Sequence, residues 1–382
     1  MMKCRLAAIV AGALAVGACS SLNPFSSDAK IPALKPLTQQ ALATSEAWKG
    51  RVGGAGRFVF QPAITGDSSA GAVFAAAADG AVSRLQGGRA TWKTSVNTPI
   101  SGGVGSDGRL VVVGSPKGEV IALEAESGQI KWRVSVNAEI LAAPVVSDGM
   151  VVVRSSDSRL FGLDPTDGRQ RWVYQRALPP LALRNAAGVA LEGGAVFAGF
   201  PGGKLVAVNA LNGTLMWEGA VAVPRGATEL ERIADITSLP VLGARVGCAV
   251  AYQGRVACFD LTNGSTLWNR DMSSSKGLDM DSRQVFVTDE KGAVHALDQS
   301  SGASAWKQDQ LAGRGVGRPR IVGDYVVVGD VEGYLHVLRK EDGSLVGRQR
   351  IDSSPILADI QRAGGDVVVQ TQDGTVSAVR VQ

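Results

Sequence analysis

A repeated unit that runs along almost the whole chain constrains the fold more than any other feature of the sequence. Each copy has a turn residue, usually glycine, then a short apolar strand, a second glycine and a tryptophan. In six copies ten residues separate the first marked position from the second glycine, and four more reach the tryptophan position. That position holds Trp132, Trp172, Trp217, Trp268, Trp306 and, in the last of these copies, Gly347. Such self-similarity predicts a repeat architecture.

Turn signals divide each copy into short strands. In one copy, residues 140–144, 151–153 and 160–163 are apolar runs, and the strand around Trp172 follows them. Such runs indicate antiparallel hairpins, and the 48 glycines supply the many tight turns that hairpins need. Residues 48–382 divided by eight give about 42 residues per copy, a typical length for a four-stranded blade. The sequence therefore predicts an all-β fold, an eight-bladed β-propeller with four-stranded antiparallel blades.

The two ends of the repeat series are incomplete in complementary ways. The final copy begins near Gly374 and lacks a tryptophan strand, whereas Trp48 has no repeat before it. We therefore expect the strand around Trp48 to complete the last blade, so that N- and C-terminal strands close the ring. All seven tryptophans then occupy one slot, where each can lie against the neighbouring blade while the preceding glycine permits the turn.

The first 18 residues have the features of a secretion signal. Lys3 and Arg5 form a basic start, and residues 6–16 are an almost unbroken apolar run that is too short to span a bilayer. The whole chain has a net charge of +4, and two of its cations lie in this segment. The mature protein is therefore close to neutral, and nothing in its charge favours a nucleic-acid partner.

The signal ends in Val-Gly-Ala-Cys, which resembles the bacterial lipobox. In that motif the cysteine, here Cys19, becomes the lipidated N-terminus; the alternative is an ordinary cleaved signal that contains a cysteine. Ser20 stands where an aspartate usually retains Gram-negative lipoproteins at the inner membrane, so the resemblance implies the outer membrane. We expect a signal peptide at 1–18, a lipidated tether at 19–45 and the propeller at 46–382.

Few residues are available for catalysis or metal binding. The two histidines, His295 and His336, stand at equivalent strand positions, where other copies have varied residues, so catalytic triads and histidine metal sites are disfavoured. Cys248 and Cys258 flank a turn, and either a disulfide or two small buried residues would fit. The second interpretation is favoured, because a shift of one residue would place them on opposite faces of the sheet.

A glycine-rich stretch at 313–317 faintly resembles a phosphate-binding loop. It lacks the preceding strand and the following helix that give such a loop its function, so it is interpreted as a turn. Arg314, Arg318 and Arg320 form a basic cluster there. A binding surface is one interpretation of this cluster, and a solvated loop is the favoured one.

Departures from the repeat indicate where a propeller carries its function. The connections after Trp172 and Trp217 are longer than the others, and they should emerge on one face from adjacent blades. The first contains residues 178–184, and the second contains residues 224–235, where Thr228 followed by acids can cap a short helical turn. We expect a docking patch here, although loops that cover the end of the propeller, or sequence drift, would also explain the insertions.

The repeat is similar to the docking motif of the quinoprotein propellers, which implies one enzymatic alternative. Quinoprotein dehydrogenases bind pyrroloquinoline quinone (PQQ) with a calcium ion, and many have two adjacent cysteines near the cofactor. This chain has no adjacent cysteine pair and is almost entirely scaffold. A quinone-dependent dehydrogenase therefore remains only the alternative, and no cofactor, catalytic residue or metal ligand is expected.

A more specific resemblance covers the full length. The lipobox, the tether, eight repeats, the Leu-x-Leu-Arg insertion and the Glu-x-Glu-Arg-Ile-Ala-Asp insertion resemble the BamB family of the β-barrel assembly machinery. This resemblance implies a non-enzymatic lipoprotein on the periplasmic face of the outer membrane. It would bind the periplasmic domains of BamA and assist barrel insertion, and unfolded outer-membrane proteins are a further potential partner.

The resemblance also implies which residues bind the partner. The interacting positions of the family correspond to Leu181, Leu183, Arg184 and Asp235. Asp235 would supply a complementary acid or would position the neighbouring loop. The family has a second acid two residues later, where this chain has Thr237, which leaves the contribution of that position open.

Overall fold

The computed structural model describes residues 31–37, 42–66, 71–147 and 149–381. The expected signal peptide at 1–18 and the expected lipidation site at Cys19 lie outside this part of the chain. The described residues form 32 strands in eight four-stranded antiparallel sheets and contain no α-helix. Accordingly, no helix in this part of the chain is long and apolar enough to cross a membrane.

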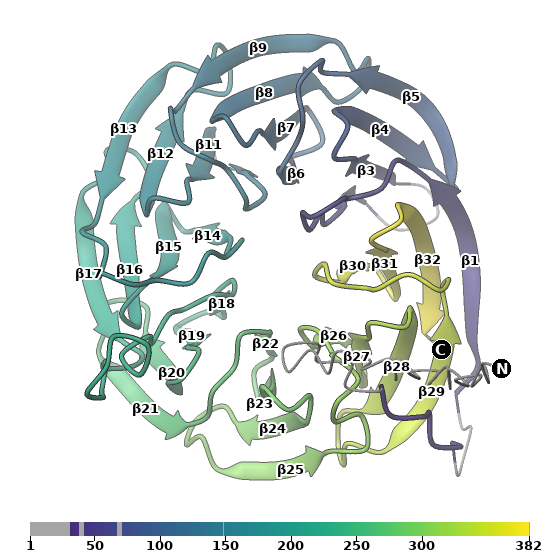
Figure 1. Ribbon diagram of the computed structural model, residues 1–382, viewed down its shortest axis with the longest axis vertical. Coiled ribbons are helices and arrows are strands. Elements are labelled where there is room, and N and C mark those ends of the chain that lie inside the picture. Colours follow the sequence, from purple (N-terminus) through teal and green to yellow (C-terminus); the bar gives the residue numbers. More distant parts are fainter. Residues whose placement is uncertain (1–30, 38–41, 67–70, 148, 382) are drawn as a thin grey trace, which may run out of the picture.

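The eight sheets are the blades of a propeller, arranged around one axis with each first strand innermost and each fourth strand on the rim (Figure 1). Blades one and two consist of β2 (Ala63–Thr65), β3 (Ala72–Ala76), β4 (Ala81–Gln86), β5 (Arg89–Ser95), β6 (Gly102–Ser106), β7 (Leu110–Gly114), β8 (Glu119–Glu124) and β9 (Ile130–Ser135). Blades three and four consist of β10 (Val145–Ser147), β11 (Met150–Arg154), β12 (Arg159–Leu163), β13 (Gln170–Gln175), β14 (Val189–Glu192), β15 (Ala195–Phe200), β16 (Lys204–Asn209) and β17 (Leu215–Ala220).

The remaining blades continue the same order around the ring. Blades five and six consist of β18 (Val241–Leu242), β19 (Val246–Val250), β20 (Arg255–Asp260), β21 (Thr266–Asp271), β22 (Gly277–Met280), β23 (Gln284–Thr288), β24 (Val294–Asp298) and β25 (Ser304–Gln308). Blades seven and eight consist of β26 (Arg320–Val322), β27 (Tyr325–Gly329), β28 (Tyr334–Arg339), β29 (Leu345–Arg350), β30 (Gln361–Ala363), β31 (Asp366–Gln370), β32 (Thr375–Val381) and β1 (Thr44–Arg51).

Blade eight closes the ring with a strand from each end of the described chain. β1 pairs with β32, and Trp48 lies opposite Ala378. In Figure 1 the purple N-terminal strand lies beside the yellow C-terminal strand. The predicted eight-bladed fold and its closure by terminal strands are therefore confirmed. β1 begins at Thr44, two residues before the expected domain boundary at 46.

The repeated tryptophan joins each blade to the next. The Trp132 indole donates a hydrogen bond to the carbonyl of Pro165 in the following blade, at 3.0 Å. A β-bulge precedes Trp132 in β9 and turns the ring toward that blade. Gly168 of the following blade lies against the ring, and a Cβ there would be 2.6 Å from Trp132 Cε3. The repeat glycine thus supplies a positive φ of 77° and also leaves room for the preceding tryptophan.

The same indole bond recurs at five further seams. It runs from Trp92 to Ala125, Trp172 to Ala210, Trp217 to Leu261, Trp268 to Gln299 and Trp306 to Lys340. The sequence pattern predicted the slot, and the structure adds that each glycine belongs to the seam with the previous blade.

Blade seven has Gly347 in the tryptophan slot, and the structure explains why. Its neighbour, blade eight, has no turn between its third and fourth strands, because β32 and β1 come from opposite ends of the chain. No repeat glycine is therefore available there to receive a ring. The chain entering β1 covers the position instead: a Cβ on Gly347 would be 3.3 Å from Thr44 Cγ2, and Leu42 is buried beside Val346.

The preferred interpretation of the two mature-chain cysteines is wrong. Cys248 and Cys258 lie directly opposite each other in β19 and β20 and form a disulfide. Opposed residues of an antiparallel pair project from the same face of the sheet, which brings their side chains together. Both cysteines are fully buried, so the disulfide also occupies the small-residue slot of the repeat.

The solvated-loop interpretation of the basic cluster is also wrong. The 313–317 stretch is a turn between β25 and β26, as expected, but Arg314 and Arg318 are only 1% and 7% exposed. Arg314 Nε donates to Asp330 at 2.9 Å, and Arg318 Nη1 donates to Asp359 at 2.6 Å. Arg318 also donates to the carbonyl of Leu278, so this residue links blade six to the start of blade eight.

Candidate functional site

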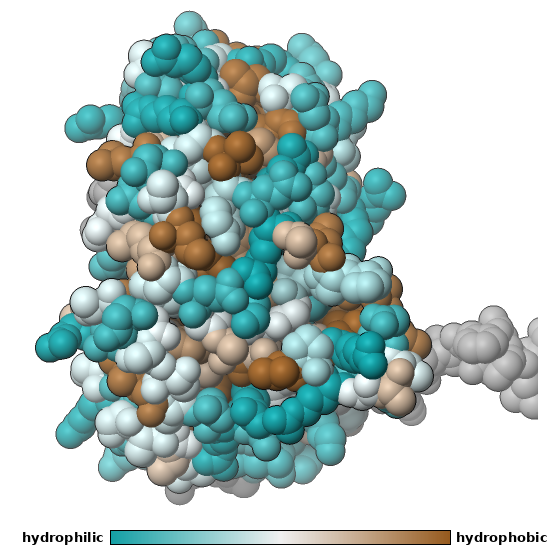
Figure 2. All heavy atoms as spheres, turned by 90° about the vertical axis from the view of Figure 1, so that its left-hand side faces the viewer, coloured by the Kyte–Doolittle hydropathy of each residue, from teal (hydrophilic) through white to brown (hydrophobic). Residues whose placement is uncertain are grey.

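Two long connections lie side by side on one face of the disc. The first insertion, residues 176–188, joins β13 to β14, and the second insertion, residues 221–240, joins β17 to β18. Because the strands alternate in direction, every link from an outer strand to the next inner strand reaches this face, here called the insertion face. Figure 2 shows the rim that lies on the left-hand side of Figure 1. At the height of the second insertion, the molecular surface projects from one edge of the disc.

Asp235 fastens the two insertions to each other. Its carboxylate is fully buried and accepts the amide of Leu183 at 2.7 Å and the amide of Gly202 at 3.0 Å. Its own carbonyl accepts the amide of Tyr252 at 2.8 Å. One residue of the second insertion therefore binds the first insertion, a turn of blade four and a turn of blade five.

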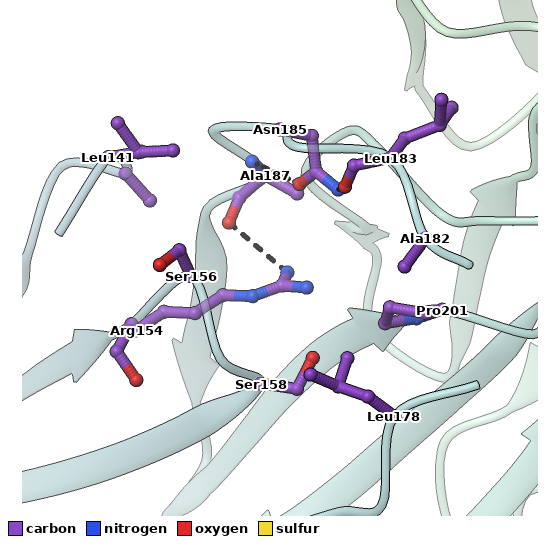
Figure 3. Close-up of a pocket in the computed structure, with 12 residues that line it drawn as sticks. Leu141, Arg154, Ser156, Ser158, Leu178, Ala182, Leu183, Asn185, Ala187 and Pro201 are labelled. Carbon is purple, nitrogen blue, oxygen red and sulfur yellow. Dashed lines mark hydrogen bonds between the residues drawn. The ribbon is translucent and has the colours of Figure 1, made fainter. Parts of the chain in front are cut away.

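Arg154 lies beneath this junction. It ends β11, is 7% exposed, and donates to the carbonyl of Ala187 at 3.1 Å (Figure 3). Its guanidinium lies 5.3 Å from the ring centre of Phe200, within the range of a cation–π contact. Burial lowers the pKa of Arg154 to about 10, although the nearby carboxylate of Asp235 opposes the shift. Arg154 therefore supplies a buried positive charge close to the Asp235 carboxylate.

The first insertion presents the other predicted site residues to solvent. Leu181 is 40% exposed, Leu183 is half-buried, and the Arg184 side chain is 55% exposed. Arg184 donates to both oxygens of Glu139, at 2.6 Å and 3.2 Å. This hydrogen bonding raises the pKa of Arg184 above its ordinary value and fixes the direction of the guanidinium. Leu178, which is also exposed, extends the apolar part of the surface.

The tip of the second insertion is a single capped turn. Glu231 Oε2 accepts the amides of Ala227 and Thr228, and the amide of Glu231 donates back to Thr228 Oγ1. This is the reciprocal arrangement of a capping box, which the sequence predicted from the threonine and its following acids. The turn holds Leu230 at the surface, where it is 67% exposed.

Thr237 lines the wall of a cavity on the insertion face. The cavity has a volume of about 520 Å³ and is lined in part by Leu183, Leu239 and Leu357. The Thr237 hydroxyl makes one long hydrogen bond, of 3.4 Å, to the carbonyl of Ser275. A neutral side chain with one weak bond holds the position where the resemblance implied an acid.

The structure thus separates the predicted site residues into two groups. Leu181 and Arg184 are on the surface with part of Leu183, whereas Asp235 is buried with both oxygens bonded to the backbone. Of the two roles expected for Asp235, the geometry favours positioning the neighbouring loop and not an acidic surface contact. Sequence reasoning missed Arg154, although a charged residue at the end of the apolar run 151–153 is a signal that could have identified it.

Both histidines are structural partners of turn acids. His295 Nε2 lies 2.9 Å from Asp289 Oδ2, and His336 Nε2 lies 2.9 Å from Asp330 Oδ2. Each acid precedes its histidine by six residues and also accepts backbone amides of the same turn. Within the described ranges, no three His, Cys, Asp or Glu side chains are grouped so that they could hold a metal ion.

Fold and site together define an eight-bladed β-propeller that carries paired insertions on one face. Residues 78–308 and 309–382 match the family described as outer membrane protein assembly factor BamB. The chain belongs to this family.

Individual relatives agree with this assignment. The chain is 41% identical over 381 residues to the outer membrane protein assembly factor BamB of Bordetella pertussis, covering 98% of this chain and 97% of that protein. The crystal structure of BamB from Moraxella catarrhalis superposes with a TM-score of 0.82 at 28% identity, covering 88% of this chain and all of that one. A quinohemoprotein alcohol dehydrogenase from Pseudomonas putida HK5 has a TM-score of 0.70 at 14% identity, covering 91% of this chain and 78% of that one, which shows a shared fold alone.

Proposed function

We propose that this chain is a non-catalytic scaffold of the β-barrel assembly machinery that binds the periplasmic domains of BamA. The observation that carries the proposal is the pair of insertions joined by Asp235, which presents Leu181, Leu183 and Arg184 on one surface. Membership of the BamB family supports the assignment to outer-membrane protein assembly.

The surface has the composition of a protein–protein contact. The leucines supply apolar contact area, and Arg184 supplies a directional hydrogen-bond donor of a residue type that is enriched among the residues that dominate binding energy in interfaces. Glu139 holds Arg184 in place before a partner arrives, so less side-chain entropy is lost on binding. Asp235 and Arg154 act from below by fixing the backbone that carries these side chains.

The proposal is tested by copurification with BamA from envelope extracts. Arg184→Glu places an acid next to Glu139, which reverses the local charge, and should abolish recovery of BamA without lowering the melting temperature by more than a few degrees. Arg89→Glu is the matched control, because Arg89 is an exposed arginine on the outer strand of blade one. Loss of BamA with the control and not with Arg184→Glu would place the interface elsewhere.

We further propose that Cys19 carries lipids that hold the protein on the periplasmic face of the outer membrane. Several acyl chains on one residue give stable attachment, because each buried methylene contributes roughly 0.8 kcal/mol. Cys19→Ser should move the protein from the membrane fraction to the soluble periplasmic fraction. Density-gradient separation of the wild type should place it with the outer membrane. Unchanged membrane attachment of Cys19→Ser would contradict lipidation at this residue.

A further inference from the structure

A described part of the tether lies against blade seven. Residues 31–37 lie beside β28 and β29, and two arginines bind their backbone (Figure 1). Arg314 Nη1 donates to the carbonyl of Pro32, and Arg348 Nη2 donates to the carbonyl of Lys35 at 3.1 Å. These bonds join the N-terminal segment to a blade that lies far from it in sequence.

Both guanidinium groups are fixed by residues of the blade itself. Arg314 is 1% exposed and bonds Asp330 through Nε at 2.9 Å and through Nη2 at 2.7 Å. Arg348 Nε donates to His336 Nδ1 at 3.3 Å, while His336 Nε2 faces the same Asp330. Burial lowers the pKa of His336, which keeps the ring neutral and able to accept this bond. Nη1 of Arg314 and Nη2 of Arg348 are therefore directed toward the backbone of residues 31–37.

The blade surface is also shaped for the tether. Gly313 has a φ of 77°, and a Cβ there would lie 3.1 Å from Pro32 Cγ. A side chain at this position would press against the proline ring. Leu34 and Leu37 are partly buried, whereas the side chain of Lys35 remains exposed. The contact thus combines backbone hydrogen bonds with apolar packing and leaves the charged side chain in water.

We propose that residues 31–37 are a docked section of the tether, held by Arg314 and Arg348 on the edge of blade seven. Gly313 and Arg314 belong to the connection between β25 and β26, which reaches the insertion face. The docked section therefore meets the propeller at the rim of the face that carries the two insertions. This consequence for membrane geometry rests on the proposed lipidation of Cys19, whereas docking itself does not.

Docking shortens the reach of the anchor. Thirteen residues separate Cys19 from Pro32, and a fully extended chain of that length spans about 45 Å. If the chain were free up to Thr44, twenty-five residues would span about 85 Å. The docked section thus roughly halves the greatest distance between the membrane and the propeller.

Docking can be measured by pulsed electron paramagnetic resonance with spin labels at Ala33→Cys and Glu341→Cys. The full-length Cys4→Ser, Cys19→Ser chain leaves only these thiols free and makes the result independent of lipidation. We expect one narrow distance distribution. Replacing residues 31, 32 and 34–37 by glycine and serine, with the labelled cysteine kept at position 33, should broaden it without touching the propeller. Arg348→Gln should broaden it as well. Arg339→Gln, at an exposed arginine of the same blade, should leave it narrow.

A broad distribution in the unsubstituted tether, or a narrow one that survives its replacement, would overturn the proposal. If Arg348→Gln also lowers the melting temperature, its broadening can come from a destabilised blade. The variant with the replaced tether then decides whether residues 31–37 are docked, because it changes no residue of a blade. Failure of lipidation would appear separately, as unchanged fractionation of Cys19→Ser. Lipidated protein in vesicles tests whether docking shortens the distance between the membrane and the propeller. Energy transfer from a donor at residue 341 to acceptor lipids should fall when the tether is replaced. Unchanged energy transfer would contradict the shortened distance.

Discussion

The seams between blades and the junction between the two insertions are held by opposite kinds of contact. Six of the eight seams use a buried or partly buried tryptophan against a glycine of the next blade, so the contact is repeated around the ring. The junction depends on one carboxylate, that of Asp235, which binds two backbone amides above the buried charge of Arg154. The ring therefore repeats its contact from blade to blade, whereas these side-chain hydrogen bonds of the junction come from a single residue. Stability and recognition should accordingly respond to different substitutions.

The largest effect on stability is expected at a seam. Trp132→Ala removes a ring that is 7% exposed and packed between blades two and three, which should cost about 3–5 kcal/mol of unfolding free energy. Denaturant unfolding measures this cost. Because the insertions are unchanged, the folded fraction should still bind BamA. If Trp132→Ala lowers the unfolding free energy by less than about 1 kcal/mol, the seams are not the main source of stability in the ring.

A smaller but more localised effect is expected at the junction. Asp235→Asn removes the charge that balances Arg154 and turns one acceptor into a donor facing a backbone amide. The expected cost is about 1–3 kcal/mol. Hydrogen exchange should accelerate at the Leu183 amide, and BamA recovery should fall. Asp271→Asn is a matched control, because the Asp271 side chain is 87% exposed; equal effects of both changes would show that the buried carboxylate has no special role.

The smallest effect is expected at Thr237. Thr237→Ala removes a hydroxyl that makes one bond of 3.4 Å, so the change in stability should stay within about 0.5 kcal/mol. BamA recovery should fall less than with Asp235→Asn. Parallel pulldowns of the two variants provide the measurement. A larger loss of BamA recovery with Thr237→Ala than with Asp235→Asn would show that binding depends more on the cavity wall than on the Asp235 junction.

The sequence was sufficient for the features that repeat and insufficient for those that depend on a single pairing. Blade number and the tryptophan slot followed from spacing, because each copy buries the same positions. The link between Cys248 and Cys258 did not follow, since it depends on strand register, and a shift of one residue reverses the face of every side chain. Burial of Arg318 depends on Asp359, forty-one positions away, and no local pattern indicates that contact.

The candidate site shows the same division. The unusual lengths of the two connections indicated where to look, and the threonine and acids of the second insertion predicted its capped turn. The bonds of Asp235 to Leu183 and Gly202 form only when three separate turns meet on one face. The lengths of the connections and the capping pattern therefore indicated the region, whereas the division between exposed and supporting residues was apparent only in the folded structure.

The pairing of β1 with β32 has a consequence for how the molecule is made. The two strands come from opposite ends of the chain, so their contact is among the most distant that the sequence permits. Bringing such ends together costs entropy that is recovered only when the strands pair, which slows folding. For the exported protein proposed above, the ring would remain an open arc until β32 has crossed the inner membrane, and β1 would stay unpaired until then. Until β1 and β32 pair, the ring is unfinished and is most exposed to proteases and chaperones.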